Sequence, residues 1–258
     1  MPRFAANLSM MFTEVPFLDR FAAAASAGFK AVEVLFPYEQ PAAEVRARLE
    51  ANGLTQALFN LPPGNAEQGE RGLAALAGRE AHFARALDLA LRYAEATGCR
   101  RLHAMAGLHQ HGAERATFIA NLRKATEIAG RHGVEILIEP INARDVPGYF
   151  LNRLEDARDI IAEVGSPHLG LQLDVYHRQI VAGDLTAALR EFMPLTRHMQ
   201  IANPPDRGEP DDGEINYSSI FRLIDDLGYT GFVGCEYRPR NGTREGLVWA
   251  QKLGVKLG

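Results

Sequence analysis

The sequence predicts a (β/α)8 TIM barrel of the α/β class, formed by a single domain that spans residues 1–258. Short apolar runs alternate with longer helical patterns along the whole chain, and several helical patterns end at a glycine just before the next apolar run. Eight such units leave about 32 residues for each, as expected for this barrel. An open doubly wound sheet usually has a glycine-rich turn after its first strand, but residues 10–13 here read Met-Met-Phe-Thr.

The predicted strands are nearly continuous apolar stretches, such as Ile136-Leu137-Ile138. This pattern is typical of parallel strands that are covered on both faces. In chain order, we expect strands at Phe4–Ser9, Ala31–Phe36, Thr55–Asn60, Arg101–Ala106, Glu135–Glu139, Gly170–Asp174, His198–Ala202 and Gly231–Glu236.

The predicted helices lie between these strands. Phe17–Ala27 is rich in alanine and stops at Gly28, and Pro41–Asn52 begins with a proline, which suits the first turn of a helix. Glu80–Thr97 carries apolar residues at helical spacing on one face. The remaining expected helices are Phe118–His132, Leu154–Val164, Leu185–Phe192 and Ser218–Leu227.

Two long loops are expected at Gly64–Gly78 and Asn203–Asn216. Both follow predicted strands, so both should lie at the carboxyl ends of the strands. Active sites of TIM barrels are found at this end, which makes these loops candidates for substrate contacts.

The composition excludes several classes of protein. Lys and Arg number 28 against 32 Asp and Glu, which gives a formal net charge of −4, and 47% of the residues are hydrophobic. Extensive disorder and a broad basic surface for nucleic acid are therefore disfavoured.

No apolar run reaches the length of a membrane span, the first residues lack a signal-peptide core, and two cysteines indicate a reducing compartment. We expect a cytoplasmic enzyme or binding protein with a small-molecule ligand and no nucleic-acid or membrane partner; a homo-oligomer is compatible with the sequence.

Motifs for several common chemistries are missing. The chain contains no phosphate-binding P-loop, no G-x-G-x-x-G, no H-E-x-x-H, no G-x-S-x-G and no C-x-x-C. Nucleotide hydrolysis, nicotinamide redox chemistry and serine-hydrolase chemistry therefore have no support from sequence motifs.

Four polar residues stand at the ends of four successive predicted strands: Glu139, Asp174, Gln200 and Glu236. They are separated by 35, 26 and 36 residues, which is close to one βα unit each. A single carboxylate at a strand end often caps a helix or pairs with an arginine. Three of them in one barrel mouth repel one another, by on the order of 4 kcal/mol for a pair ~4 Å apart at an effective dielectric constant of about 20. A divalent cation relieves this repulsion, and a ligand set of oxygens suits Mg²⁺ or Mn²⁺ better than Zn²⁺.

Several segments of the chain form a recognisable set. The two most specific are Glu139-Pro140-Ile141-Asn142 and Gly234-Cys235-Glu236-Tyr237, and the others are Phe4–Ser9, Val34–Tyr38, Phe59–Gly64, Pro147–Phe150, Asp174–His177, Asp212–Tyr217 and the continuation to Pro239. Together they closely resemble the hydroxypyruvate isomerase family of xylose-isomerase-like TIM barrels. The resemblance covers the chain from Phe4 to about Trp249.

The resemblance implies an isomerase that interconverts hydroxypyruvate and 2-hydroxy-3-oxopropanoate (tartronate semialdehyde), or a close relative that acts on 2-oxo-tetronates. It also implies that Glu139 and Glu236 transfer protons, and that Glu139, Asp174, Gln200 and Glu236 hold a divalent metal ion. The chain departs from the family at Gly208, where relatives often have a histidine in the sequence Arg-His-Glu-Pro.

Four further residues are candidates for binding the substrate. His177 follows Asp174 by three residues and could bind a hydroxyl or a carboxylate, although a histidine hydrogen-bonded at the rim is the alternative. Arg207, in the loop after the seventh strand, could neutralise a substrate carboxylate or be an exposed loop residue. His103 and Asn7, at the ends of the fourth and first strands, are weaker candidates.

Aldose–ketose isomerisation needs a base, an acid and a cation for the developing oxyanion, and Glu139 and Glu236 come from non-adjacent strands that could flank a small substrate. Two alternatives stay open. A ketose 3-epimerase of the same superfamily would deprotonate a different carbon and accept uncharged sugars, and a non-catalytic barrel would bind a sugar acid without turnover. A DNA-repair endonuclease of the superfamily is disfavoured, because the seventh strand offers Gln200 and the chain is acidic overall.

Overall fold

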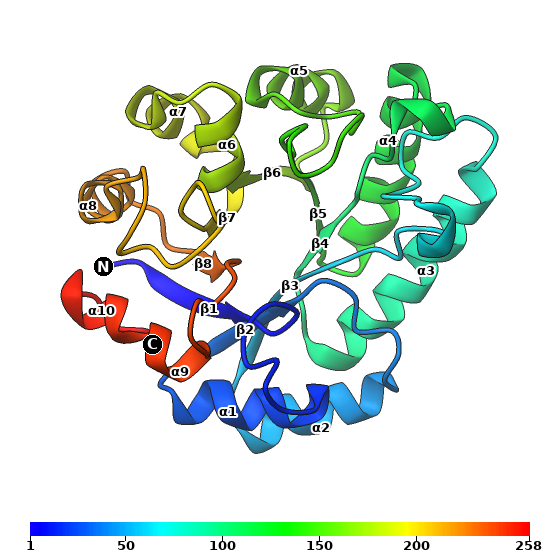
Figure 1. Ribbon diagram of the computed structural model, residues 1–258. Coiled ribbons are helices and arrows are strands. Elements are labelled where there is room, and N and C mark those ends of the chain that lie inside the picture. Colours follow the sequence, from blue (N-terminus) through cyan, green and yellow to red (C-terminus); the bar gives the residue numbers. More distant parts are fainter.

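In the computed structural model, which describes all of residues 1–258, eight parallel strands close into a barrel in the order of the chain (Figure 1). Each strand pairs with the next, and β8 pairs with β1 to close the ring. The predicted fold class is therefore confirmed. The strands are β1 (Arg3–Asn7), β2 (Ala31–Val34), β3 (Thr55–Asn60), β4 (Arg101–His103), β5 (Glu135–Ile138), β6 (Leu169–Asp174), β7 (Thr196–Ile201) and β8 (Phe232–Cys235).

Helices surround the barrel and connect the strands (Figure 1). None of them is both long and apolar enough to span a membrane. The α-helices are α1 (Arg20–Ser26), α2 (Ala42–Ala51), α3 (Glu80–Thr97), α4 (Arg115–Arg131), α5 (Leu154–Val164), α6 (Val175–Val181), α7 (Leu185–Phe192), α8 (Tyr217–Asp226), α9 (Thr243–Gly246) and α10 (Val248–Lys252), and the short 3₁₀ segments are Phe17–Asp19, Ala66–Gln68, His109–His111 and Met193–Leu195.

The predicted elements are found, but several of their ends were wrong. β4 stops at His103 rather than Ala106, β2 stops at Val34 rather than Phe36, and β7 begins at Thr196 rather than His198. Leu35 and Phe36, just beyond β2, are half-buried and exposed, respectively, and line the cavity at the barrel mouth, so their hydrophobicity reflects the cavity wall rather than strand pairing. An apolar run alone cannot separate these two causes.

The short helix α6 was missed. Its first residue, Val175, directly follows the last residue of β6. The side chain of Asp174 accepts a hydrogen bond from the backbone N–H of Tyr176 at 2.8 Å, which is the usual arrangement of a helix N-cap. One residue therefore ends a strand and starts a helix, and no loop separates the two.

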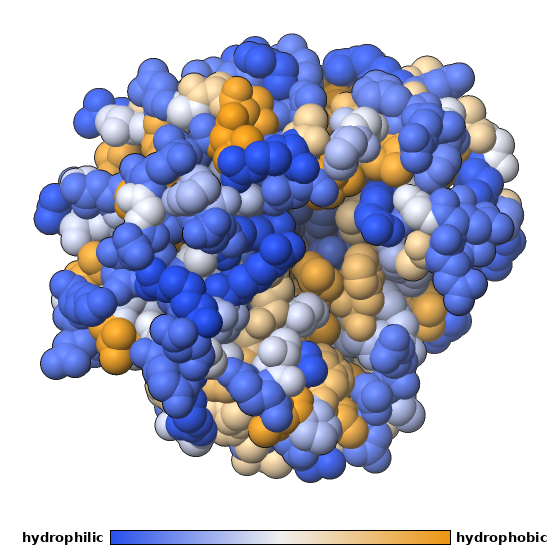
Figure 2. Space-filling model, in the orientation of Figure 1, coloured by the Kyte–Doolittle hydropathy of each residue, from blue (hydrophilic) through white to orange (hydrophobic).

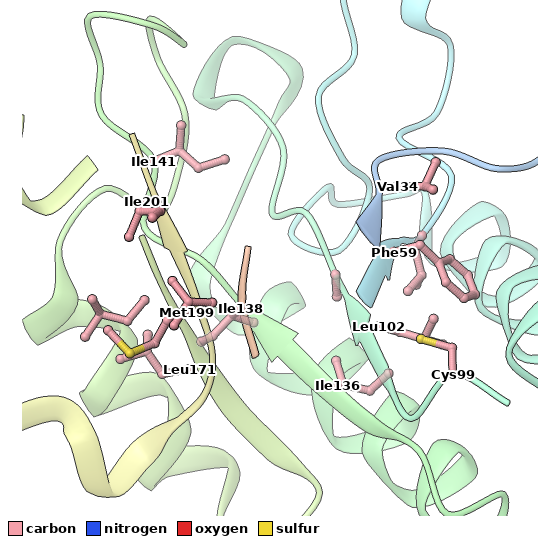
Figure 3. Packing of buried hydrophobic residues seen from close by; sticks show 14 of the residues in the cluster. Val34, Phe59, Cys99, Leu102, Ile136, Ile138, Ile141, Leu171, Met199 and Ile201 are labelled. Carbon is pink, nitrogen blue, oxygen red and sulfur yellow. The ribbon is translucent and has the colours of Figure 1, made fainter. Parts of the chain in front are cut away.

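The main hydrophobic core lies between the strands and the surrounding helices. Alternate residues of the strands contribute to it, as Ile136 and Ile138 of β5 do together with Leu171 of β6 (Figure 3). Helix side chains such as Phe118 and Leu122 of α4 complete this layer and are fully buried. The core therefore uses one face of each strand and leaves the other face for the barrel interior.

Candidate active site

The interior face of the barrel is unusually polar. Residues two apart on a strand share a face, so Gln172 and Asp174 of β6 point the same way, as do His198 and Gln200 of β7. Glu33 of β2 contacts both His198 and Gln200, although β1 and β8 lie between β2 and β7 in the ring. These side chains therefore meet across the inside of the barrel.

Three of the predicted carboxylates converge at the carboxyl ends of the strands. Glu139, Asp174, His177 and Glu236 are all buried, and one potential ligand atom of each lies within 4.8 Å of the others. Glu139 directly follows β5, Glu236 directly follows β8, Asp174 ends β6, and His177 lies in the first turn of α6. We call Glu139, Asp174 and Glu236 the acidic cluster.

The acidic cluster is short of hydrogen-bond donors. Asp174 uses Oδ1 to cap α6, whereas its Oδ2 has no hydrogen-bond partner, and Oε1 of Glu139 also has none. Both oxygens are buried. Buried acceptors without partners cost free energy, and almost all such groups in folded proteins are compensated. Asp174 Oδ2 and Glu139 Oε1 therefore make the free energy of folding less favourable, and a bound cation would offset this effect.

Burial and mutual repulsion change the pKa of these carboxyls. Burial raises the pKa of Glu236 to about 8, although the adjacent guanidinium of Arg207 lowers it. Burial likewise raises the pKa of Asp174 to about 6, against the opposing effect of Arg207. The pKa of Glu139 is raised well above its ordinary value by burial and by the charges of Glu236 and Asp174. In the absence of a cation, the cluster therefore retains protons near neutral pH.

Two neutral imidazoles border the cluster. His177 Nε2 lies 3.6 Å from Asp174 Oδ2 and 3.9 Å from Glu139 Oε1, and His103 Nδ1 lies 3.5 Å from Glu139 Oε2. Burial lowers the pKa of His103 to about 3, with a further contribution from His198. Burial also lowers the pKa of His177 well below its ordinary value. A neutral imidazole offers one donor and one acceptor, so either ring could bind a substrate hydroxyl or, through its lone pair, a metal ion.

Arg207 compensates part of the negative charge. Its Nη2 lies 2.5 Å from Glu236 Oε2 and 4.0 Å from Asp174 Oδ2, and its Nη1 lies 3.3 Å from Asp145 Oδ2. The guanidinium also lies over the ring of Tyr176, 5.0 Å from its centre. Arg207 was predicted to bind the substrate, and the structure places it in the cavity but already paired with two carboxylates.

A second set of buried polar side chains adjoins the cluster, and we call it the Glu33 network. Oε1 of Glu33 accepts from Gln200 Nε2 at 2.8 Å and from Asn7 Nδ2 at 2.9 Å, and Oε2 lies 2.6 Å from His198 Nε2. Gly234 is required beside it, because a Cβ at this position would clash with the carboxylate of Glu33. Both carboxylate oxygens of Glu33 are thus satisfied by protein groups.

Gln200 belongs to this network in the structure. Its Nε2 donates to Glu33, and its Oε1 accepts from Gln172 Nε2 at 2.6 Å. Gln200 pairs with Asp174 across the β6–β7 ladder, so it is next to the acidic cluster. Coordination of a metal by Gln200 stays a prediction, and it requires that the amide oxygen leave Gln172. His177 is an alternative fourth ligand.

A cavity of about 590 Å³ opens onto the acidic cluster. Glu139, Glu236, His103, His177 and Arg207 line it, and the remaining wall comes from residues at or after the ends of β1, β2, β3, β4, β5 and β8. Figure 2 shows a hollow at the centre of the molecule, where hydrophilic and hydrophobic residues both reach the surface. Its size suits a small molecule.

Two other positions singled out in the sequence, Asn7 and Gly208, do not line the cavity. The side-chain amide of Asn7 donates to Glu33 at 2.9 Å and to Glu236 Oε1 at 3.4 Å, so it contacts the carboxylate of Glu236 without being part of the cavity wall. A Cβ at Gly208 would have no other atom within 4 Å, so the first atom of a side chain here would meet no obstacle. The role of each predicted site residue remains a prediction.

Sequence reasoning missed Glu33 and two arginines. Glu33 is a charged residue in the middle of an apolar strand, two residues after Ala31 on the same face, and this interruption was the available signal. Arg71 and Arg238 also line the cavity. Both are exposed loop residues. Arg238 lies in the recognised segment that ends at Pro239, two residues after Glu236, and this position was the available signal, whereas nothing in the local sequence distinguishes Arg71 from other surface arginines.

The fold and the site together define a class of protein. Residues 21–253 match the family described as xylose isomerase-like TIM barrel, and the chain belongs to this family. The family resemblance seen in the sequence is therefore confirmed.

Full-length relatives narrow the class further. The chain is 58% identical over 253 residues to a 2-oxo-tetronate isomerase of Cupriavidus necator, and the match covers 96% of this chain and 97% of the relative. It is 42% identical over 253 residues to the hydroxypyruvate isomerase of Escherichia coli, with 96% and 98% covered. A crystal structure described as an AP endonuclease, family 2, from Brucella melitensis superposes with a TM-score of 0.95 at 49% identity and covers 98% of this chain and 99% of that chain.

Proposed function

We propose that the protein is an isomerase of small hydroxy-oxo acids. It would interconvert hydroxypyruvate and 2-hydroxy-3-oxopropanoate, or carry out the equivalent reaction on a 2-oxo-tetronate. The observation that supports this most is the pair Glu139 and Glu236: two buried carboxyls with raised pKa that line one cavity from non-adjacent strands. Relatives of full length carry the names of both reactions.

The two glutamates suit a proton transfer between neighbouring carbons. One takes the proton from the hydroxyl-bearing carbon to form an enediolate, the hydroxyl proton passes to the former carbonyl oxygen, and the other glutamate delivers a proton to the former carbonyl carbon. Both carboxyls are buried and line the same cavity, so each can lie within reach of a substrate carbon, as a positioned acid or base requires. The roles exchange in the reverse direction, because the base of one direction is the acid of the other.

Neighbouring residues hold these groups and the substrate. Arg207 and Asn7 contact the two oxygens of Glu236 at 2.5 and 3.4 Å and fix its orientation. His103 and His177 line the cavity as neutral rings and are placed to bind substrate oxygens. This assignment keeps the substrate between the two carboxyls.

The donor set fits a divalent cation, since buried carboxylate oxygens of Glu139 and Asp174 have no other partner. We propose Mg²⁺ or Mn²⁺, held by Glu139, Asp174, Glu236 and a fourth group, which is Gln200 or His177. Such an ion acts as a Lewis acid on the oxygens of the substrate and stabilises the negative charge that develops on them.

The competing functions make different demands on the substrate. The 2-oxo-tetronate reaction is favoured as the second candidate by the 58% identity to an enzyme of that name. A 3-epimerase would act on neutral ketoses, and a binding protein would turn over nothing.

A substrate panel distinguishes these functions. Hydroxypyruvate, a four-carbon 2-oxo acid and a neutral ketose are compared with Mg²⁺, with Mn²⁺ and with a chelator. We expect kcat/KM for the acids to be far higher than for the neutral ketose, with loss of turnover under chelation. Turnover of the neutral ketose alone would support the epimerase. A rise in melting temperature when one of the oxo acids is added, without any turnover, would support the binding protein.

A further inference from the structure

Two arginines at the open end of the cavity have no partner of opposite charge. Arg71 lies in the loop after β3 and Arg238 in the loop after β8, and both side chains line the cavity. No carboxylate lies within 4.0 Å of either guanidinium, and the only side-chain hydrogen bond of the two runs from Arg71 Nη1 to the carbonyl of Glu70 at 3.0 Å. Both residues are exposed, whereas Glu139 and Glu236 are buried.

Arg207 shows the opposite situation in the same cavity. It contacts Glu236 and Asp145, and it is far more buried than the other two arginines. Its charge therefore belongs to the acidic cluster. The sequence pointed to Arg207 as a residue that could neutralise a substrate carboxylate, and this stays a prediction, but its guanidinium is already paired with carboxylates of the protein, whereas those of Arg71 and Arg238 are not.

Arg71 and Arg238 favour an anionic ligand. They bring two positive charges to the cavity wall, and no carboxylate of the protein lies within 4.0 Å of either guanidinium. Charged groups that line a cleft with low-dielectric walls focus the field and attract a ligand of the opposite sign.

Part of the cavity wall is apolar. Leu35, Met105, Ile141 and Val146 line it, and none of them offers a charge. Arg71 and Arg238 are therefore the charged groups of the lining that remain without a carboxylate partner and can pair with a carboxylate of the ligand.

We infer that Arg71 and Arg238 hold the carboxylate of the substrate and thereby select oxo acids over neutral sugars. This inference rests on the proposed function. Guanidinium groups form paired hydrogen bonds with carboxylates, and such charge-assisted bonds are stronger than neutral ones. Arg71 and Arg238 are therefore specificity-determining residues, separate from the groups that transfer protons.

The test compares an acid with its neutral counterpart. Steady-state kinetics on hydroxypyruvate and on dihydroxyacetone, which has a hydroxymethyl group in place of the carboxylate, are measured for the wild type, Arg71→Gln, Arg238→Gln and the double variant. We expect the ratio of kcat/KM for the acid to that for the neutral ketose to fall about tenfold in each single variant and further in the double variant, mainly through KM. Arg71→Lys and Arg238→Lys keep the charge and should recover part of the loss.

A control variant and a binding measurement make the outcome decisive. Arg48→Gln removes an exposed arginine on α2, far from the cavity lining, and should leave the ratio unchanged. Calorimetric binding of D-glycerate, an acid without a reactive carbonyl, should weaken about tenfold in Arg71→Gln and Arg238→Gln.

Failure of the inference is distinct from failure of the proposed function. An unchanged ratio, or equal losses for the acid and the neutral ketose, overturns the inference and leaves the isomerase intact. If the wild type turns over no oxo acid, the proposed function fails, and D-glycerate binding alone decides the inference. Binding that is insensitive to both arginines would then overturn it.

Discussion

Two buried acidic regions lie side by side inside this barrel, and the protein treats them differently. Glu33 is 1% exposed, and its oxygens accept from Asn7 and Gln200 and lie 2.6 Å from His198. The acidic cluster is also buried, but oxygens of Glu139 and Asp174 have no hydrogen-bond partner. Both carboxylate oxygens of Glu33 have partners within the protein, whereas carboxylate oxygens of the acidic cluster do not; the only unpartnered atoms around Glu33 are Nδ1 of His198 and Oε1 of Gln172, which belong to neutral side chains. We interpret the Glu33 network as a framework that positions neighbouring side chains, and the acidic cluster as the site that binds a cation and the substrate.

The largest expected effect is on catalysis. Replacing Glu139 or Glu236 by Gln should reduce turnover about a hundredfold or more, because a positioned acid or base typically contributes ~10²–10⁴-fold. In one of the two variants, exchange of the substrate carbon-bound proton with deuterated solvent should survive without product formation, and assays from the opposite side of the reaction should reverse this pattern.

These kinetics need two controls. Metal content is measured in each variant, because both glutamates are also proposed ligands. Glu95→Gln, an exposed change on α3, should have wild-type activity. A metal-loaded Glu139→Gln or Glu236→Gln enzyme that keeps more than about a tenth of wild-type turnover contradicts the two-glutamate mechanism.

The next largest effect is on the free energy of unfolding, and it is expected for substitutions in the Glu33 network. Glu33→Ala leaves Asn7, His198 and Gln200 buried without their common partner, and we expect a loss of about 3–5 kcal/mol in the free energy of unfolding. Glu33→Gln preserves the shape and part of the hydrogen bonding and should lose less. Urea unfolding of the metal-free proteins measures both. A loss below about 1 kcal/mol for the alanine variant would show that the network contributes little.

A smaller effect is expected from pH. Between about pH 6.5 and about 8, native Glu236 still binds a proton that the unfolded chain has released, and the raised pKa of Glu139 acts in the same direction. The native state then binds more protons than the unfolded state, so the free energy of unfolding of the metal-free protein should fall as pH rises. The lowered pKa values of His103 and His177 act in the opposite direction, but only below about pH 6.5, where unfolded histidines become charged.

Denaturant titrations across this window, in the presence of a chelator, measure the slope. It should reach at most about 1.4 kcal/mol per pH unit for each proton concerned. Glu236→Gln should flatten it. A metal-free stability that does not change across the same window would mean that the glutamates are ionised throughout.

The smallest effect on stability is expected for Asp174→Asn. The asparagine oxygen can still accept the hydrogen bond from Tyr176 N–H that caps α6, and one negative charge leaves the acidic cluster. The free energy of unfolding without metal should be unchanged or higher, as measured by urea unfolding. Severe destabilisation would identify Asp174 as a structural ion-pair partner of Arg207, whose Nη2 lies 4.0 Å away.

The sequence was sufficient for the barrel and for the convergence of the three carboxylates. Periodicity located the strands, and the rule that parallel strands end at the same rim then brought Glu139, Asp174 and Glu236 together. The rest depends on side-chain partners that spacing does not determine. Whether Gln200 faces the acidic cluster or Glu33 is decided by Gln172 and Glu33, which lie on other strands.

The partners of side chains in the loops could be predicted from the sequence even less. Arg207 and Arg71 are both arginines in loops after strands, yet one is paired with Glu236 and the other has no charged partner. The difference arises from how the loops after β7 and β3 fold over the mouth, which no local pattern encodes. Glu33 was within reach, because a lone charge in an apolar strand is itself a signal.

The central claim is that the acidic cluster is incomplete without a divalent cation, and thermal unfolding during a Mn²⁺ titration tests it most directly. The melting temperature of the wild type should rise with Mn²⁺, since an ion that binds only the folded state adds about 2.7 kcal/mol at a hundred times its Kd. The rise should be largely lost in Asp174→Asn and retained in Glu95→Gln. A melting temperature that does not respond to Mn²⁺, or that responds equally in Asp174→Asn, would contradict the claim.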